Sequence, residues 1–251
     1  MKPAEHINDN IALFQNEGSL AYGTDAYLLS AYIRRQSKEK ACEFGAGSGV
    51  ISLLLAARNR FSHITAIEIQ EKIAEIAVKN VETNGFSEKI QVLCRDVREL
   101  ESSLNGAFGV VFSNPPYMTT ASGKLNVNEA DSMSRHEVNG TIRDFCASAS
   151  KLLKYGGLFY AVYRPDRLGE LLYACKSNQL EPKRMTLVYP TVNHAPCLML
   201  LEAKKNGSEG MMVTKPLIIY KEGLPQTNEN YTDDMNYIYQ NGAFHELYQR
   251  L

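Results

Sequence analysis

Short apolar strands alternate with amphipathic helical patterns from about residue 20 to residue 177 of the chain. Parallel neighbouring strands need a long crossover connection, which is usually an α-helix. The alternation therefore predicts βαβ units with right-handed crossovers, and hence a parallel sheet covered by helices. Strands are expected at 40–44, 63–67, 90–94, 109–112 and 158–163, and helices at 26–33, 50–57, 71–84 and 142–154.

The last third of the chain predicts a different kind of pairing. Segments 184–189 and 198–203 are expected to form an antiparallel pair at the sheet edge, and 213–220 predicts one further strand. The polar tail contains one predicted short helix at 232–239. With 251 residues, the chain is long enough for one large domain. We expect an α/β fold with a mostly parallel seven-stranded sheet, an antiparallel edge strand and short N- and C-terminal extensions.

Composition and charge argue against several classes of protein. No apolar run reaches the roughly 18 residues of a membrane-spanning helix, and the N-terminus lacks the apolar region of a signal peptide. The five cysteines are scattered without paired spacing, which predicts reduced thiols, no metal site and a cytoplasmic protein. The 27 basic and 28 acidic residues give a net charge of −1, so no global basic footprint for nucleic acid is present.

A glycine-rich turn, EFGAGSG, is expected where the first strand runs into a helix. Its glycines, Gly45, Gly47 and Gly49, let the backbone pass under a ligand, and the helix N-terminus offers free N–H groups. The spacing GxGxG differs from the dinucleotide fingerprint GxGxxG and suits a ligand without a pyrophosphate. Glu43, just before the turn, favours a cationic ligand such as S-adenosylmethionine, which carries a sulfonium and an ammonium.

Two more carboxylates follow the next predicted strands. Glu68, with Ile69 after it, stands about 20 residues beyond the glycine turn, where a carboxylate accepts hydrogen bonds from ribose hydroxyls. Asp96, followed by Val97, ends the third strand and is expected to face the adenine of the cofactor. Ligands of open α/β sheets bind along the carboxyl edge of the strands, so three acidic residues at successive strand ends predict a cofactor site there.

The fourth strand runs into the motif NPPY, which is Asn114-Pro115-Pro116-Tyr117. An amine conjugated to a ring is a poor nucleophile because its lone pair is delocalised. The Asn114 side-chain oxygen and the Pro115 carbonyl can each accept one N–H of such an amine and aim its lone pair at a methyl group. The prolines hold the carbonyl rigidly and Tyr117 offers a stacking face. The motif therefore predicts methylation of a planar amino group.

The pairing of EFGAGSG with NPPY resembles the class I amino-methyltransferases that depend on S-adenosylmethionine. The chain is most similar to the bacterial tRNA(Val) adenine-37 N6-methyltransferase family, over nearly its whole length. This resemblance implies a class I methyltransferase (Rossmann-like) fold, and it implies cofactor contacts from Gly23, Thr24 and Asp25 within YGTDA. Its further segments are YGTDA at 22–26, RHE at 135–137, the run at 156–165, LEPKR at 180–184, PLIIY at 216–220 and YT at 231–232.

The resemblance also predicts how the chain is organised and what it binds. We expect residues 1–36 to form an N-terminal arm and helix that packs on the cofactor site, with Thr24 or Asp25 capping the helix. Residues 37–251 are expected to form the methyltransferase domain. We expect a monomer that binds tRNA and neither DNA nor a membrane.

Substrate contacts are expected from residues around the catalytic loop. Tyr117, Lys124, Arg135, His136 and Arg164 are the predicted substrate-binding residues. An alternative is that Arg135 and His136 belong to a helix-capping cluster with Glu137. A basic rim around the site is expected to contain Lys124, Arg164, Arg167, Lys183 and Arg184.

Three other functions compete with methylation of a tRNA adenine. A protein glutamine N5-methyltransferase, acting for example on a release factor, would use NPPY equally well. Such enzymes carry a helical domain before the glycine turn, and only 42 residues precede Glu43 here. A DNA adenine methyltransferase would need a sizeable recognition insertion, and no such block is present. A non-catalytic scaffold would have no physical reason to keep Asn114 with Glu68 and Asp96.

Overall fold

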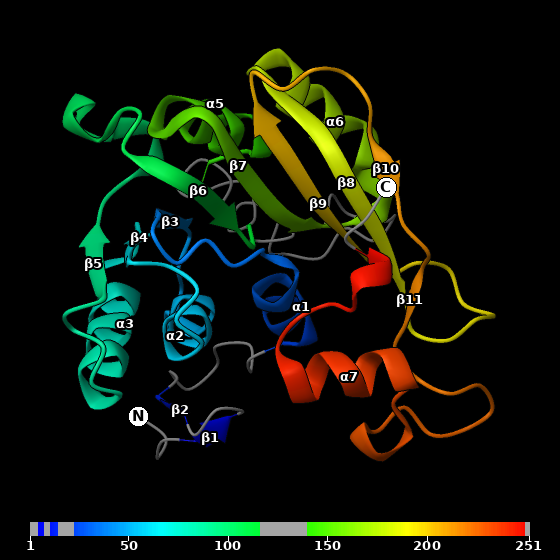
Figure 1. The fold of residues 1–251 in the computed structure, drawn as a ribbon. Coiled ribbons are helices and arrows are strands. Elements are labelled where there is room, and N and C mark those ends of the chain that lie inside the picture. Colours follow the sequence, from blue (N-terminus) through cyan, green and yellow to red (C-terminus); the bar gives the residue numbers. More distant parts are fainter. Residues whose placement is uncertain (1–4, 8–10, 15–22, 116–139, 249–251) are drawn as a thin grey trace, which may run out of the picture.

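The computed structural model describes residues 5–7, 11–14, 23–115 and 140–248 of the chain. A nine-stranded sheet runs through the middle of the molecule in the order β10-β8-β9-β7-β6-β3-β4-β5, and β11 also pairs with β8 (Figure 1). The strands are β3 (Lys40–Phe44), β4 (His63–Glu68), β5 (Ile90–Cys94), β6 (Phe108–Ser113), β7 (Leu153–Tyr163), β8 (Leu180–Tyr189), β9 (Leu198–Lys205), β10 (Met212–Val213) and β11 (Leu217–Ile218).

Helices cover both faces of this sheet, as the alternating pattern predicts (Figure 1). On one face lie α1 (Thr24–Tyr32), α2 (Val50–Ala57), α3 (Glu71–Thr83) and α7 (Asp233–Asn241), and on the other lie α5 (Ile142–Leu152) and α6 (Leu168–Ser177). The core is correspondingly double. Val110 and Phe112 of β6 pack in the cluster with α1 and α2, while Val111 packs in the cluster with α5 and α6. This alternation follows from the period of two along a strand.

The carboxyl ends of the central strands lie at one edge of the sheet. Phe44 at the end of β3 is in register with Ile67 of β4 and with Ser113 of β6. Ser113 is in turn opposite Ala161 of β7, and all these pairings are parallel. The predicted α/β fold with a mostly parallel sheet is confirmed. So is the antiparallel pairing, because β9 runs antiparallel to both β7 and β8.

The edge beyond β8 is more elaborate than expected. Seven strands form the predicted sheet, and the two-residue strands β10 and β11 both add to it by pairing parallel with β8. The single strand predicted at 213–220 is therefore wrong. Pro216 stands between the two short strands, and proline has no N–H to donate to a ladder.

The N-terminal residues form a separate hairpin under α3. Strands β1 (Glu5–Ile7) and β2 (Ile11–Leu13) pair antiparallel with each other and are not part of the large sheet. Asn84 accepts from Ala12 N at 2.9 Å and donates to Ala12 O at 2.8 Å. Asn80 makes the same two bonds with Phe14, at 2.8 and 3.1 Å. The side-chain amides of α3 therefore take the place of a neighbouring strand.

The C-terminal region is fastened to α1 and the sheet by a buried arginine. Arg184 of β8 is 1% exposed, and its guanidinium carbon lies 3.8 Å from the centroid of the Tyr32 ring. It donates to Glu202 Oε2 at 2.8 Å, to Tyr32 O at 2.9 Å and to Tyr248 O at 3.0 Å. One side chain thus joins β8, β9, α1 and the last described turn.

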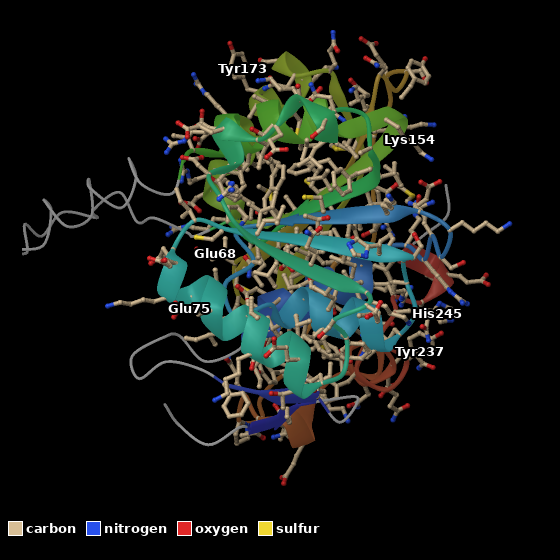
Figure 2. The ribbon with its side chains drawn as sticks, turned by 90° about the vertical axis from the view of Figure 1, so that its left-hand side faces the viewer. Glu68, Glu75, Lys154, Tyr173, Tyr237 and His245 are labelled. Atoms are coloured by element: carbon tan, nitrogen blue, oxygen red, sulfur yellow. The ribbon has the colours of Figure 1, made fainter. Side chains whose placement is uncertain are left out.

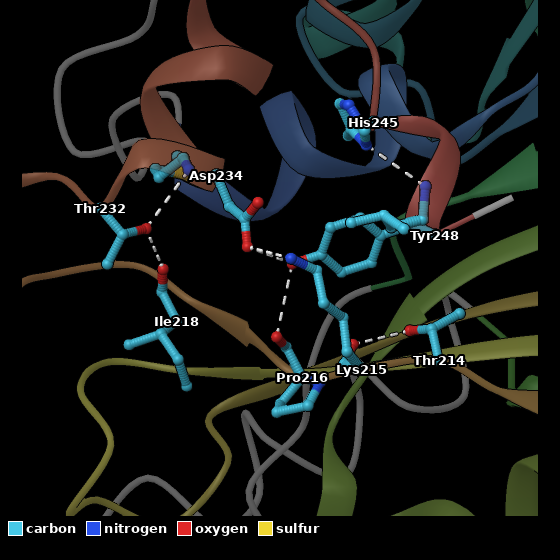
Figure 3. Close-up of polar contacts among 10 residues, drawn as sticks. Thr214, Lys215, Pro216, Ile218, Thr232, Asp234, His245 and Tyr248 are labelled. Atoms are coloured by element: carbon cyan, nitrogen blue, oxygen red, sulfur yellow. Dashed lines mark hydrogen bonds and ion pairs between the residues drawn. The ribbon is translucent and has the colours of Figure 1, made fainter.

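The start of α7 is fixed by a second set of polar contacts (Figure 3). Thr232 caps the helix by accepting from Met235 N at 3.3 Å, and its hydroxyl donates to Ile218 O at 2.5 Å. Asp234 accepts from Tyr248 Oη at 2.9 Å and from Lys215 Nζ at 2.7 Å (Figure 3). These bonds attach α7 to the segment that contains β11.

Candidate active site

The glycine turn between β3 and α2 leaves open space at the carboxyl edge of the sheet. Gly47 and Gly49 have φ angles of 56° and 82°, in the left-handed region that favours glycine. A Cβ built on Gly47 would meet no atom of the described residues within 4 Å. Ala46 N donates to Ile67 O at 2.9 Å, which ties the turn to β4. The turn therefore leads into the first N–H groups of α2, which a helix leaves without intrahelical acceptors.

Glu68 connects this turn to the next strand and helix. Its carboxylate is 5% exposed, and Oε2 accepts from Gly47 N at 2.9 Å while Oε1 accepts from Gln70 N at 3.0 Å. Figure 2 shows Glu68 at the edge of the sheet beside the start of α3. A carboxylate has about four lone-pair sites, so these two bonds leave acceptor capacity on both oxygens. Ile69 follows Glu68 and is half-buried.

Asp96 lies beyond the end of β5 and caps the short helix η2 (Val97–Glu99). Its Oδ1 accepts from Arg98 N at 2.8 Å, and the Arg98 guanidinium pairs with Oδ2 at 2.5 Å. This hydrogen bond from Arg98 holds the pKa of the Asp96 carboxyl below its usual range. Val97 is buried directly after it. Asp96 therefore presents an ionised acceptor one strand away from Glu68.

Asn114 completes this edge at the end of β6. Ser113 Oγ donates to Phe44 O at 2.9 Å, which joins β6 to β3 just before the glycine turn. The Asn114 side chain donates from Nδ2 to Asp25 Oδ2 at 3.0 Å, over 89 residues of chain. Asp25 Oδ1 accepts from Ala26 N at 2.8 Å. The start of α1 and the end of β6 are thereby joined beside the glycine turn.

Comparison with known proteins finds a matching family model. Residues 16–170 match the family model described as the methyltransferase small domain. That match covers more than half of the chain. The chain belongs to the methyltransferase small domain family.

Individual methyltransferases resemble the chain over most of its length. A protein of Flavobacteriaceae bacterium strain 3519-10, named tRNA1(Val) (adenine(37)-N6)-methyltransferase, is 25% identical over 86% of this chain and 90% of its own. A protein of the same name from Bacteroides fragilis strain YCH46 is 29% identical over 70% and 73%. A solved structure of a predicted O-methyltransferase from Agrobacterium tumefaciens is 24% identical, with a TM-score of 0.70, and covers 88% of this chain and 98% of that one.

The methyltransferase site fits S-adenosylmethionine, the methyl donor of class I methyltransferases. A Cβ on Gly47 would meet no described atom within 4 Å, Glu68 keeps free lone pairs on its carboxylate, and Asp96 is an acceptor at the end of the next strand, which is the set of groups that a ribose and an adenine amine need. The described residues contain no group of three or more His, Cys, Asp and Glu side chains placed to hold a metal ion.

The predicted role of Glu43 does not agree with its position. The side chain is 1% exposed, and its Oε2 accepts from the Ser52 hydroxyl and from Ser52 N, the latter at 3.2 Å. Burial raises the pKa of Glu43 to about 8, so at neutral pH the group is mostly protonated. A neutral side chain turned towards the first turn of α2 does not face a cationic ligand. Glu43 instead fixes α2 against β3.

The predicted basic rim is partly wrong. Arg184 is buried in the core, because on β8 it points to the face that α1 covers. Lys183 precedes it in the amino half of β8, away from the carboxyl edge, and donates to Ser208 O and Gly210 O. Arg164 and Arg167 do follow the carboxyl end of β7, where they pair with Asp166 and Glu170.

Five of the predicted site residues lie outside the described residues. They are Pro116, Tyr117, Lys124, Arg135 and His136. Pro115 is described and is buried after Asn114. The prediction that Thr24 or Asp25 caps α1 is wrong. Gly23 is the N-cap, and no side-chain hydrogen bond caps the helix. Thr24 begins the helix, and the Asp25 carboxylate bonds Asn114 instead of capping.

Sequence reasoning missed one residue that supports the glycine turn. Asn80 is fully buried in the last turn of α3, where its Nδ2 donates to Ser48 O at 2.9 Å as well as to Phe14 O. Asparagine is a poor residue for a helix interior, because its side chain competes for backbone hydrogen bonds. An asparagine inside the predicted helix 71–84 was therefore the sequence signal that this side chain has a specific hydrogen-bonding role.

Proposed function

We propose that this methyltransferase transfers the methyl group of S-adenosylmethionine to the exocyclic N6 amine of an adenine in tRNA, at position 37 of the anticodon loop. The observation that carries the proposal is Asn114, held beside the glycine turn by its bond to Asp25. The names of the relatives from Flavobacteriaceae and Bacteroides support the choice of substrate. A base in a loop is unstacked at little cost, so a large module for opening duplexes is not required.

The proposed mechanism uses position and fixed dipoles more than acid–base chemistry. S-adenosylmethionine, when bound, supplies an electrophilic methyl group on a sulfonium. Asn114 Oδ1 and the Pro115 carbonyl accept the two N–H groups of the adenine amine and turn its lone pair towards that methyl carbon. Transfer would form the nitrogen–carbon bond as the sulfur–carbon bond of the donor breaks, and the amine nitrogen would then lose one proton to water. No described side chain has to act as a strong base.

Cofactor binding is assigned to the carboxyl edge of the sheet. Glu68, followed by Ile69, would hold the ribose, and Asp96 with Val97 would hold the adenine. The glycine turn would lie under the methionine part, and the arm of residues 1–36 would pack beside it. The bond that Asn80 makes to both Phe14 and Ser48 supports this place for the arm.

The proposed substrate surface begins at Arg164. This side chain follows β7 at the same edge and pairs with Asp166. A substrate phosphate could replace the Asp166 carboxylate as the partner of the Arg164 guanidinium. Tyr117, Lys124, Arg135 and His136 are proposed to join it. A tRNA substrate would place the protein in the cytoplasm, where we propose that it acts as a monomer. No described helix is long and apolar enough to cross a membrane.

The test is methyl transfer from labelled S-adenosylmethionine to bulk tRNA that lacks the modification, followed by nucleoside analysis. The expected product is N6-methyladenosine, lost in the Asn114→Ala variant. Mapping the label to position 37 would complete the assignment. Cofactor binding without any label in RNA would overturn the proposed substrate and direct the search to a protein glutamine.

A further inference from the structure

Asp25 has a partner in the site besides the cofactor contact that the resemblance implies, because its carboxylate accepts from the Asn114 side-chain amide. We infer that Asp25 is a positioning residue: it sets the orientation of the Asn114 side-chain amide, so that the oxygen and not the nitrogen faces the amine to be methylated. The inference rests on the proposed function and assigns to the start of α1 a part in the reaction itself.

The chemistry of the two groups decides which way the amide is turned. An ionised carboxylate only accepts hydrogen bonds, whereas a carboxamide has a donor end and an acceptor end. With Asp25 Oδ2 3.0 Å from the amide, only Nδ2 can face it, since two oxygens at that distance would repel each other. Oδ1 of Asn114 is therefore turned away from Asp25.

The orientation matters because the substrate amine has hydrogens to give. An amide turned the other way would present its N–H groups to those of the amine and its oxygen to the Asp25 carboxylate. Neither the hydrogen bond to the amine nor the one to Asp25 would then form. The bond to a charged acceptor also polarises the amide, which increases the negative charge on Oδ1 and makes it a better acceptor. Asp25 thus acts on the reacting nitrogen through Asn114.

Asp25 is itself held on both sides. Its Oδ1 accepts from Ala26 N at 2.8 Å, so each carboxylate oxygen has a fixed partner. Gly23 gives the carboxylate room to fold back, because a Cβ there would lie 2.3 Å from Asp25 Oδ1. The glycine before the helix and the aspartate within it therefore serve the same bond.

Asp25→Asn is the primary test, because it keeps size and shape and adds a second donor. At saturating S-adenosylmethionine and tRNA we expect kcat to fall roughly 10- to 100-fold, as is typical when an outer partner of a functional group is lost. The dissociation constant of S-adenosylmethionine, from calorimetry, should change less than about threefold. Unchanged kcat with weaker cofactor binding would overturn the inference and make Asp25 a cofactor ligand.

A matched control and an indirect variant separate positioning from folding. Asp234 is also the second residue of a helix and also accepts hydrogen bonds, but it lies in α7, so Asp234→Asn should leave kcat unchanged. Gly23→Ala should lower kcat because it displaces an unaltered Asp25. If Gly23→Ala had wild-type kcat with a displaced carboxylate in its crystal structure, the inference would be wrong.

Exchanging the two groups gives a rescue that a structural role would not produce. In the D25N/N114D double variant an amide donates to a carboxylate at position 114, so an acceptor oxygen again faces the amine. The double variant should be at least about tenfold more active than D25N alone, provided that the interaction energy of the pair is of the usual size for direct contacts. Activity no higher than that of D25N would overturn the inference.

NMR of the free protein keeps this result apart from the choice of substrate. In ¹⁵N-labelled wild type, one Asn114 Hδ2 proton, assigned by its absence in N114A, should be shifted downfield and protected from exchange. Asp25→Ala, which leaves no acceptor at this position, should remove both effects. Unaltered Asn114 protons in D25A would overturn the positioning of the amide even if tRNA is methylated. Wild type that shows the effect without methylating tRNA would overturn only the proposed substrate.

Discussion

Two polar networks, at the carboxyl edge of the sheet and inside its core, use the same kinds of side chain for different ends. At the edge, Asp25 bonds Asn114 and Glu68 bonds the glycine turn. In the core, Arg184 bonds Glu202 with both side chains at least 95% buried. We propose that the first network orients groups for a ligand, whereas the second joins segments of the fold.

The difference lies in what each charge does with its remaining hydrogen-bonding capacity. Glu68 bonds two backbone N–H groups and still has lone pairs to offer to a ligand. Arg184 donates its hydrogen bonds to two backbone carbonyl groups and a carboxylate, which come from residues far apart in sequence. Variants of the core network should therefore lower stability, and variants of the edge should lower binding or rate.

Arg184→Met should give the largest loss of stability. Among the described residues it leaves only Arg34, at 3.1 Å, as an ion-pair partner of the buried Glu202 carboxylate, and breaking a buried pair costs about 3–5 kcal/mol. Urea unfolding measures the loss, and kcat of the folded fraction should stay close to wild type. Arg35→Met, at an exposed arginine, is the control. Equal stabilities of the two variants would contradict the role of the core network.

Asn114→Ala should give the largest loss of rate. Removing one acceptor that acts in the transition state costs about 10²- to 10³-fold in kcat. The midpoint of thermal unfolding and the dissociation constant of S-adenosylmethionine should hardly change. Steady-state kinetics at saturating substrates measures the effect. If the variant lost stability but kept a normal kcat, Asn114 would serve the stability of the fold, as Arg184 does, and not the reaction.

Glu68→Gln should weaken cofactor binding by about tenfold, or about 1.4 kcal/mol. Its amide nitrogen would have to face either Gly47 N or Gln70 N, so one buried donor would lose its acceptor. Calorimetry with S-adenosylmethionine measures the change. Glu75→Gln, on the exposed side of α3, is the matched control (Figure 2). Equal affinities in the two variants would remove Glu68 from the cofactor site.

Glu43→Gln should have the smallest effect on stability at neutral pH. Its effect should be seen in how the free energy of unfolding changes with pH. Because the folded pKa is raised from 4.5 to about 8, only the folded state keeps the proton between these values. The contribution of Glu43 to stability is complete below about 4.5 and is lost as the pH rises through about 8. The free energy of unfolding should therefore fall less steeply over this range in Glu43→Gln than in wild type. Identical slopes would mean that Glu43 is ionised in the fold.

Local sequence signals predicted the regular elements well. The helix 50–57 is correct to the residue, and the predicted helix 71–84 ends where Asn84 and Gly85 stop α3. The meeting of Glu68 and Asn114 at one edge of the sheet also followed from sequence, because residues at strand ends meet wherever the strands are parallel. Periodicity and turn chemistry are local, so a single sequence contains them.

Long-range pairing explains what sequence did not predict. Nothing near Arg184 indicates that Glu202, Tyr32 and Tyr248 would surround it, so its charge suggested a surface residue. The bond between Asp25 and Asn114 likewise joins two motifs 89 residues apart. Helix α6 was not predicted, although its pattern was within the βαβ region. These features depend on how the elements pack.

The asparagines of α3 have a consequence for the register of the arm. A helix rises about 6.0 Å over four residues, close to the roughly 6.8 Å between alternate residues of a strand. Asn80 and Asn84 can therefore bond Phe14 and Ala12 together, and a slip of β2 by one residue would break both sets of bonds. The same bonds occupy the edge of β2 that faces away from β1. A strand of a second chain therefore cannot pair with this edge of the hairpin.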